Sequence, residues 1–285
     1  MNRRDFLGLT VSSAFLRGRF AELEPRVLRV GLLLPTAASP STRDVSAGAS
    51  LALSESERAG QLFGQSIQLN THPSGSSVNA AVIIGGTTAH DCLALSRVAE
   101  DKGIVFFNVG ATADSLRRAE CSRHMFHIAA SDAMIAAASA AAVSPGRIPV
   151  TIELWQSTLE RYGGSQLNDR YRARFGRPMT SSAWAGWVAV KIAWETSLRA
   201  GSTNPAALLT FLEKESTQFD GHKGAPLSFR AWDHQLRQPL YAVAGGNVIA
   251  ELPDVGKGGE QREQLDRFGD PPGKCVMATK QRDNG

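Results

Sequence analysis

Short apolar runs separated by polar segments divide the first half of the chain into alternating strands and helices. Residues 27–34 form an almost continuous apolar run that ends at Pro35, which is typical of a strand buried on both faces of a parallel sheet. Similar patterns predict strands at residues 67–69, 81–84, 104–108 and 125–128, and helices at residues 44–58, 89–101 and 132–143. This alternation predicts an α/β domain in which a parallel sheet is flanked by helices.

The second half of the chain groups its helices before its strands. Pro145, Gly146 and Pro149 mark a linker. Apolar periodicity then predicts helices at residues 158–175, 180–200 and 204–215, and short strands at residues 227–229, 239–244 and 248–250, with a hairpin turn at residues 245–247. We therefore expect a first α/β lobe at residues 27–144, a second lobe at residues 145–255 whose helices return to the first lobe, and a polar C-terminal tail at residues 256–285.

The N-terminus carries an export pattern. Arg3 and Arg4 stand directly before Asp5-Phe6-Leu7, which resembles the twin-arginine signal, and a short apolar stretch follows. That stretch is far below the roughly 20 residues that span a bilayer. We expect residues 1–26 to be an export signal of the twin-arginine type and the mature protein to lie in the periplasm.

Charge and motif searches exclude several function classes. The net charge is +4, but five of the arginines lie within residues 1–26 and no dense basic run follows, so nucleic-acid binding is not expected. The Gly-x-Ser-x-Gly and His-Glu-x-x-His signatures are absent, and residues 269–274 lack P-loop spacing. His124 and His127 lie three apart on a predicted strand and would face opposite sides of it. We therefore expect that the protein is not an enzyme and has no catalytic residue, no cofactor and no metal site.

The cysteines are compatible with an oxidising compartment. Cys92, Cys121 and Cys275 lie far apart and form no Cys-x-x-Cys pair, which disfavours zinc-ribbon or thioredoxin-like chemistry. In the periplasm, three cysteines predict one disulfide and one free thiol. Cys92 shares a helical face with Leu95 and Ala99, so it is expected to act as a small buried hydrophobe. These patterns leave the three possible pairings open.

Four segments carry the pattern of one protein family. They are a strand, a proline, a loop and a helix at residues 30–53, a strand–helix–strand unit ending in Gly-Ala-Thr at residues 81–112, a helix ending in Phe-Gly-x-x-Pro at residues 167–178, and a long helix at residues 182–201. Together they resemble the periplasmic substrate-binding proteins of branched-chain amino-acid ABC transporters. The resemblance implies a two-lobed type I periplasmic-binding fold that closes about a hinge on a small molecule. It also implies a monomer that delivers this molecule to an ABC permease in the inner membrane.

Two later segments narrow the resemblance. Residues 219–241 and 265–275 are similar to the subfamily associated with pyrroloquinoline-quinone (PQQ)-dependent alcohol oxidation. Members of that subfamily carry cysteines at the positions matching Cys121 and Cys275. The resemblance thus implies a Cys121–Cys275 disulfide with Cys92 reduced. It also suggests an alcohol-derived acid, an aromatic compound or PQQ itself as the ligand.

Two connections are shorter than those of the family. Only eleven residues separate Leu69 from Ala81, whereas a helical crossover needs about a dozen or more, so we expect a loop without a helix. If the flanking strands are adjacent, they should then pair antiparallel. Residues 144–157 stand where the family has several strand–helix units, so the second lobe is expected to be reduced. A periplasmic interaction or sensory module that has lost transport is therefore the alternative function.

Ligands of open parallel sheets bind beyond the carboxyl ends of the strands, where loops meet helix N-termini. Thr87 and Thr88 follow one predicted strand, and helix N-capping is their alternative role. Ala111 and Thr112 follow the next strand. The family resemblance implies ligand binding for this second pair, because matching positions in relatives hold the ligand's ammonium and carboxylate ends.

Two aromatic residues complete the candidate ligand site. Tyr162 is expected as a contact from the second lobe. Trp184, Trp187 and Trp194 form a stripe on one predicted helix, and such a stripe usually packs in the core. Trp184 stands near the helix start, so it is the member of the stripe that we expect to reach the cleft.

Overall fold

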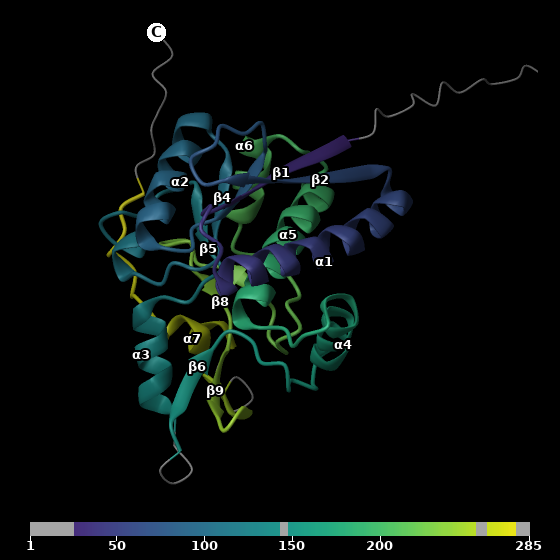
Figure 1. Ribbon diagram of the computed structural model, residues 1–285. Coiled ribbons are helices and arrows are strands. Elements are labelled where there is room, and N and C mark those ends of the chain that lie inside the picture. Colours follow the sequence, from purple (N-terminus) through teal and green to yellow (C-terminus); the bar gives the residue numbers. More distant parts are fainter. Residues whose placement is uncertain (1–25, 143–147, 255–260, 278–285) are drawn as a thin grey trace, which may run out of the picture.

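The computed structural model describes residues 26–142, 148–254 and 261–277. The predicted export signal, with Arg3 and Arg4, therefore lies outside the described residues. The first lobe is built on a five-stranded sheet of order β2-β1-β3-β4-β5, in which all neighbouring strands are parallel (Figure 1). Its strands are β1 (Arg26–Leu34), β2 (Gln65–Pro73), β3 (Val82–Gly85), β4 (Val105–Asn108) and β5 (Met125–His127).

Helices flank this sheet on both faces. The helices are α1 (Pro40–Phe63), α2 (Ala89–Lys102), α5 (Ser181–Ala200) and α6 (Pro205–Leu212). Successive strand residues point to opposite faces, so Leu32 packs in the core cluster formed with α1, α5 and α6, while Leu33 packs in the cluster formed with α2. The sheet is thus buried on both sides over β1, β3 and β4, as the continuous apolar run predicts.

Two glycines let α1 and α5 approach closely. A Cβ atom on Gly48 would lie 1.8 Å from Ala183 O, and one on Gly186 would lie 2.2 Å from Val45 O. Only glycine permits this contact between two helix backbones. The contact fixes the N-terminal turn of α5 against the first lobe, which matters because that turn lines the candidate site described below.

The connection from β2 to β3 contains no helix, as its length predicts. The expected antiparallel pairing of the flanking strands does not arise, because β1 lies between β2 and β3 and both run parallel to it. The structure extends β2 to Pro73, and residues 74–81 form the crossover past β1 without a helix or strand.

The second lobe contains a three-stranded antiparallel sheet of order β10-β9-β6. Helix α3 packs on it through Met134 and Ala138, which contact Leu240 in one core cluster. The predicted turn is confirmed, since Gly245 and Gly246 both have positive φ and join an antiparallel hairpin. The elements are α3 (Asp132–Ala141), β6 (Val150–Glu153), β9 (Leu240–Ala244) and β10 (Asn247–Leu252).

The helix expected at residues 158–175 is shorter in the structure. Helix α4 (Gly164–Phe175) begins only after Tyr162 and Gly163, whose φ angles of 56° and 85° are left-handed and interrupt a right-handed helix. Leu167 and Tyr171 of α4 belong to the core cluster of the first lobe. Among the described residues, no helix combines the length and apolar character needed to cross a bilayer.

The C-terminal part of the chain returns to the first lobe. The hairpin of β7 (Ser228–Phe229) and β8 (Leu236–Arg237) lies beside β5, where His127 and Gln235 form a parallel bridge. The short helix α7 (Gln261–Asp266) follows, within the segment expected as a polar C-terminal tail. The predicted disulfide is confirmed: Cys121 and Cys275 are bonded with a Cα–Cα distance of 5.9 Å, and Cys92 is free and buried.

Candidate functional site

A cavity of about 170 Å³ lies between the two lobes, at the carboxyl ends of β4 and β5. Residues 128–131, 154–180 and 238–239 are described segments that pass from one lobe to the other. Both lobes contribute walls, and the lining residues are Val109, Gly110, Thr112, Ala129, Ala130, Ile135, Ile152, Glu153, Leu154, Ser181, Ser182 and Leu240.

A buried asparagine shapes the wall supplied by β4. Asn108 is the last residue of that strand and is fully buried. Its Oδ1 accepts hydrogen bonds from Gly110 N at 3.1 Å and Ala111 N at 2.9 Å, and its Nδ2 donates to Ala111 O at 2.8 Å. An Asn side chain that bonds to the following backbone holds a tight turn. The Asn108 side chain therefore fixes the loop that leads to Thr112.

Backbone amides supply the donors of the cavity. No acceptor for Thr112 N or Ala130 N lies among the described residues, although both residues line the cavity. Ser181 and Ser182 form the first turn of α5, where backbone amides have no intrahelical acceptor. Unpaired amides at a helix N-terminus, next to the positive end of its dipole, favour an anionic group.

The second lobe and α3 contribute apolar lining. These residues are Ile135 of α3, Ile152 of β6, Leu154 directly after β6, and Leu240 of β9. Glu153 is the acidic residue of the lining and is half-buried. The arrangement thus suits a small molecule with an anionic group, an apolar body and room for a positive charge near Glu153.

The Ser181 hydroxyl connects α5 to the second lobe. Its Oγ accepts hydrogen bonds from Leu154 N at 3.1 Å and Trp155 N at 3.2 Å, and it donates to Trp155 O at 3.2 Å. Thr180 caps the same helix by accepting from Ala183 N at 3.2 Å. The Ser181 hydroxyl is committed to the protein, so its backbone amide is the group that remains for a ligand.

The structure gives different positions to the two residue pairs expected at the site, Thr87 with Thr88 and Ala111 with Thr112. Thr112 lines the cavity, and Ala111 is buried directly behind it with its N–H donating to Gly86 O at 2.8 Å. Thr88 is the exposed N-cap of α2, whose hydroxyl accepts from Asp91 N, and Thr87 is half-buried beside it. Neither Thr87 nor Thr88 lines the cavity, so their contact with a ligand stays a prediction.

Both aromatic candidates lie outside the cavity lining. Trp184 is fully buried, donates to Gly221 O at 3.1 Å and stacks on Trp155 with the ring centroids 6.1 Å apart. Tyr162 is 56% exposed, and its ring covers Gly224. In this structure, Trp184 packs as the stripe's usual core role predicts, and Tyr162 is on the surface.

Sequence reasoning missed the donors of α5 and the strand opposite them. The residues Thr180-Ser181-Ser182 before an apolar helix are an N-terminal helix signature, and this signal identifies the turn. Residues 150–153 alternate apolar and polar side chains as a strand does, but the nearby Pro and Gly suggested a linker instead.

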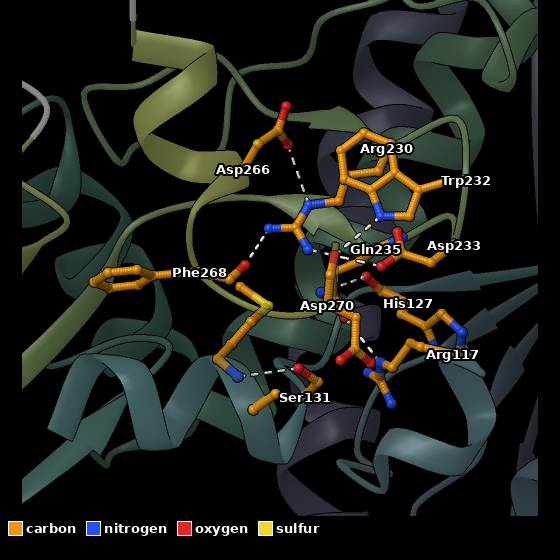
Figure 2. A network of polar contacts seen from close by, with 12 residues as sticks. Arg117, His127, Ser131, Arg230, Trp232, Asp233, Gln235, Asp266, Phe268 and Asp270 are labelled. Carbon is orange, nitrogen blue, oxygen red and sulfur yellow. Dashed lines mark hydrogen bonds and ion pairs between the residues drawn. The ribbon is translucent and has the colours of Figure 1, made fainter. Parts of the chain in front are cut away.

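A layer of buried polar side chains joins the β7–β8 hairpin to the C-terminal tail (Figure 2). Arg230 donates from Nη2 to Leu265 O at 2.8 Å and from Nε to Asp266 Oδ1 at 3.2 Å, and the same carboxylate pairs with Arg237 at 2.7 Å. Trp232 donates to Asp270 O at 3.1 Å. These bonds attach the tail to the β7–β8 hairpin.

Burial favours the neutral form of the histidines in and next to this layer. Burial, with the nearby Arg117 charge, holds the pKa of His127 well below its ordinary value. Burial also lowers the pKa of His234 to about 4. Within the three described ranges, no group of three or more His, Cys, Asp or Glu side chains is placed to hold a metal ion.

The sequence and the fold were compared with known protein families and solved structures. Residues 148–247 match the family model described as periplasmic binding protein. A search of curated protein sequences gives no match. Among solved structures, an ABC-type branched-chain amino acid transporter from Rhodopseudomonas palustris CGA009 is similar with a TM-score of 0.69 and 14% identity, covering 88% of this chain and 100% of that chain.

Two further solved structures carry ligands. The branched-chain amino acid transporter substrate binding protein LivJ from Streptococcus pneumoniae, in complex with isoleucine, has a TM-score of 0.63 and 14% identity over 79% of this chain and 99% of that chain. A solute binding protein of an ABC transporter from R. palustris, in complex with benzoate, has a TM-score of 0.62 and 17% identity over 79% of this chain and 95% of that chain. This chain thus has the α/β fold of type I periplasmic binding proteins, with a parallel sheet flanked by helices.

Proposed function

We propose that this protein is the solute-binding component of an ABC importer and holds a small carboxylate in the cavity between its lobes. The observation that carries the proposal is a set of four residues around one cavity at the carboxyl ends of β4 and β5, Thr112, Ala130, Ser181 and Ser182, whose amides have no acceptor among the described residues. These amides belong to the first lobe and to the segment that leaves it at residues 128–131, whereas Ile152 and Leu240 line the cavity from the second lobe. A ligand that touches both sides would favour the closed arrangement of the lobes.

The size and walls of the cavity limit the ligand. Its volume of about 170 Å³ is below the roughly 300–1,000 Å³ typical of sites for drug-sized molecules. The isoleucine and benzoate held by the two similar structures are both small and carry a carboxylate on an apolar body. A free amino acid or an aromatic or aliphatic acid fits this description, and an amino acid would direct its ammonium group towards Glu153.

The compartment and the partners follow from the same proposal. Residues 1–26 would direct export through the twin-arginine pathway, and the mature monomer would deliver its ligand from the periplasm to a permease in the inner membrane. Replacing Arg3 and Arg4 by lysine should leave the precursor in the cytoplasm, and an unchanged periplasmic yield would contradict the export route. A link to PQQ-dependent alcohol oxidation rests on residues 219–241 and 265–275 and would make the ligand an acid derived from an alcohol.

Thermal-shift screening of the mature chain tests the proposal. The library should pair each amino acid or organic acid with its neutral amide, because the amide keeps the shape and removes the charge. A true ligand at 100 times its Kd stabilises the folded state by about 2.7 kcal/mol. We expect at least one acid to raise Tm with concentration while its amide does not. Mass spectrometry of the same samples should find the acid unchanged, as expected for a binding protein. A library without any stabilising member would contradict the proposal.

One observation favours the alternative of a periplasmic interaction or sensory module. The described second lobe holds a three-stranded antiparallel sheet covered by α3, in place of a parallel sheet with helices on both faces. Deleting the gene and measuring uptake of the acid found by the screen separates the two functions. Loss of uptake supports transport, whereas normal uptake with intact binding supports the module.

A further inference from the structure

Arg117 lies at the end of a short 3-10 helix (Asp114–Arg117) directly behind the cavity wall and is only 1% exposed. Its guanidinium donates four hydrogen bonds: from Nε to Gln235 Oε1 at 2.9 Å, from Nη1 to Ala111 O and to Ala113 O at 3.1 Å each, and from Nη2 to Ala129 O at 2.8 Å. Figure 2 shows this side chain beside His127 and Gln235. The loops that follow β4 and β5 are thus joined by a single side chain.

The bonds to two of these carbonyl groups set the direction of two amides. In a trans peptide the C=O and the following N–H point in opposite directions. Because Ala111 O and Ala129 O point at Arg117, the amides of Thr112 and Ala130 point away from it. Thr112 and Ala130 line the cavity, and neither amide has an acceptor in the described part of the chain.

Arg117 has no ion-pair partner within the described ranges. Asp233, Asp114 and Asp132 lie near enough to favour its charged form but not at ion-pair distance, and Asp233 pairs with Arg230 at 3.6 Å. Its side-chain partner, Gln235, is neutral and also donates from Nε2 to His127 O at 3.2 Å and Ala129 O at 3.0 Å. Burial lowers the pKa of Arg117 only to about 10, so the group is a cation at neutral pH.

We infer that Arg117 is the positioning residue that makes the cavity selective for anions, because it aims the Thr112 and Ala130 amides at the ligand and places an unpaired positive charge behind them. This inference rests on the proposed function and names the feature of the fold that would select a carboxylate. A low effective dielectric strengthens both contributions, since the guanidinium is shielded from water.

NMR with the smallest carboxylate tests the inference without a known ligand. The mature protein is titrated with formate and, separately, with formamide, while the ¹H–¹⁵N signals of Thr112 and Ala130 are followed. Formate should shift both signals at concentrations where formamide does not. Arg117→Met keeps the length of the side chain and removes its charge and donors. We expect formate affinity to fall about tenfold, which equals the loss of one hydrogen bond from an amide of the loops to the formate carboxylate.

A neighbouring arginine provides the control. Arg118→Met removes a side chain that pairs with Asp114 at 3.2 Å and Asp270 at 2.8 Å and bonds to none of the residues that line the cavity, so its formate response should match the unmodified protein. If Arg117→Met does not fold, Arg117→Lys is used to test the inference in its place. Lysine keeps the charge but cannot reach all four acceptors, so the preference for formate over formamide should fall at least threefold.

Three results would overturn the inference. They are no formate shift at Thr112 and Ala130 in the unmodified protein, an unchanged preference in the Arg117 variant that folds, and an equal loss in Arg118→Met. The proposed function fails in a different way, because formate would still be preferred while no acid in the thermal-shift library stabilises the protein.

Discussion

Thr180 donates from Oγ1 to Asp44 Oδ2 at 2.8 Å, so the residue that caps α5 is bonded to the N-terminal part of α1. Asp44 is buried and also forms an ion pair with Arg177. Asp44→Ala leaves both partners unsatisfied, and we expect the free energy of unfolding to fall by about 2–3 kcal/mol, below the 3–5 kcal/mol of a fully buried pair because Arg177 is partly exposed. Urea denaturation measures the change.

The matched control for Asp44 is Asp169→Ala. Asp169 pairs with Arg172 at 3.1 Å, but both side chains are largely exposed, and such pairs contribute about 0–1 kcal/mol. A loss at Asp44 no larger than the loss at Asp169 would mean that the bond to Thr180 does not stabilise α5.

Thr112→Val should weaken ligand binding without unfolding the protein. Valine keeps the shape of threonine and removes the hydroxyl, so the acid found by screening should lose about 1–3 kcal/mol of binding free energy if Thr112 Oγ1 contacts it. Calorimetry measures this change. Thr88→Val is the control, since Thr88 caps α2 outside the cavity and its loss should lower stability by about 1 kcal/mol with affinity unchanged. Equal affinities for both variants would return Thr112 to a structural role.

Acid should destabilise the protein through His234. Burial lowers the pKa of this side chain to about 4 in the folded state, whereas an unfolded histidine titrates near 6.5. Between these values the unfolded state binds more protons, so the stability is complete above pH 6.5 and is lost as the pH falls towards 4. The expected loss from this group is about 3 kcal/mol.

Comparing urea midpoints at pH 7.5 and pH 4.5 in two variants isolates this contribution. His234→Asn removes the titration and tolerates the left-handed backbone at this position, where φ is 50°. The drop in stability between the two pH values should be smaller in His234→Asn than in His90→Asn, which replaces an exposed histidine. Identical drops would show that His234 is not the group that acid protonates.

Removing the Cys121–Cys275 bond should destabilise the protein strongly. The bond has a sequence separation of 154, for which the chain-entropy model gives about 5 kcal/mol. A Cys121→Ser and Cys275→Ser double variant should therefore unfold at a lower urea concentration, and reductant should lower the midpoint of the unmodified protein but not of the double variant. Cys92→Ala serves as the control that retains the bond, and its midpoint should remain sensitive to reductant.

Local sequence patterns predict the elements whose stability is local. The apolar run of β1, the capped helix α2 and the Gly-Gly hairpin between β9 and β10 all lie where the sequence places them. The order of strands was not predictable in the same way, because the insertion of β1 between β2 and β3 depends on contacts between distant segments.

The candidate site shows the same limit. Thr112 was accessible to sequence reasoning because it follows an apolar strand, but Ser181 and Ser182 reach the cavity only through the packing of α5 on α1. In the sequence, Arg117 is one of several basic residues in the polar segment 117–123, and no local pattern distinguishes it from Arg118 or Arg123. Its role depends on Gln235, which lies 118 residues away in the sequence.

The disulfide also turns residues 121–275 into a covalent ring that contains β5, the whole second lobe and the helices that return to the first lobe. A single cut of the backbone anywhere inside this ring would leave the two fragments joined. A nicked molecule would thus migrate as one species on a denaturing gel until reductant is added. A protease would have to cleave such a chain at least twice before any part of the ring could leave the protein.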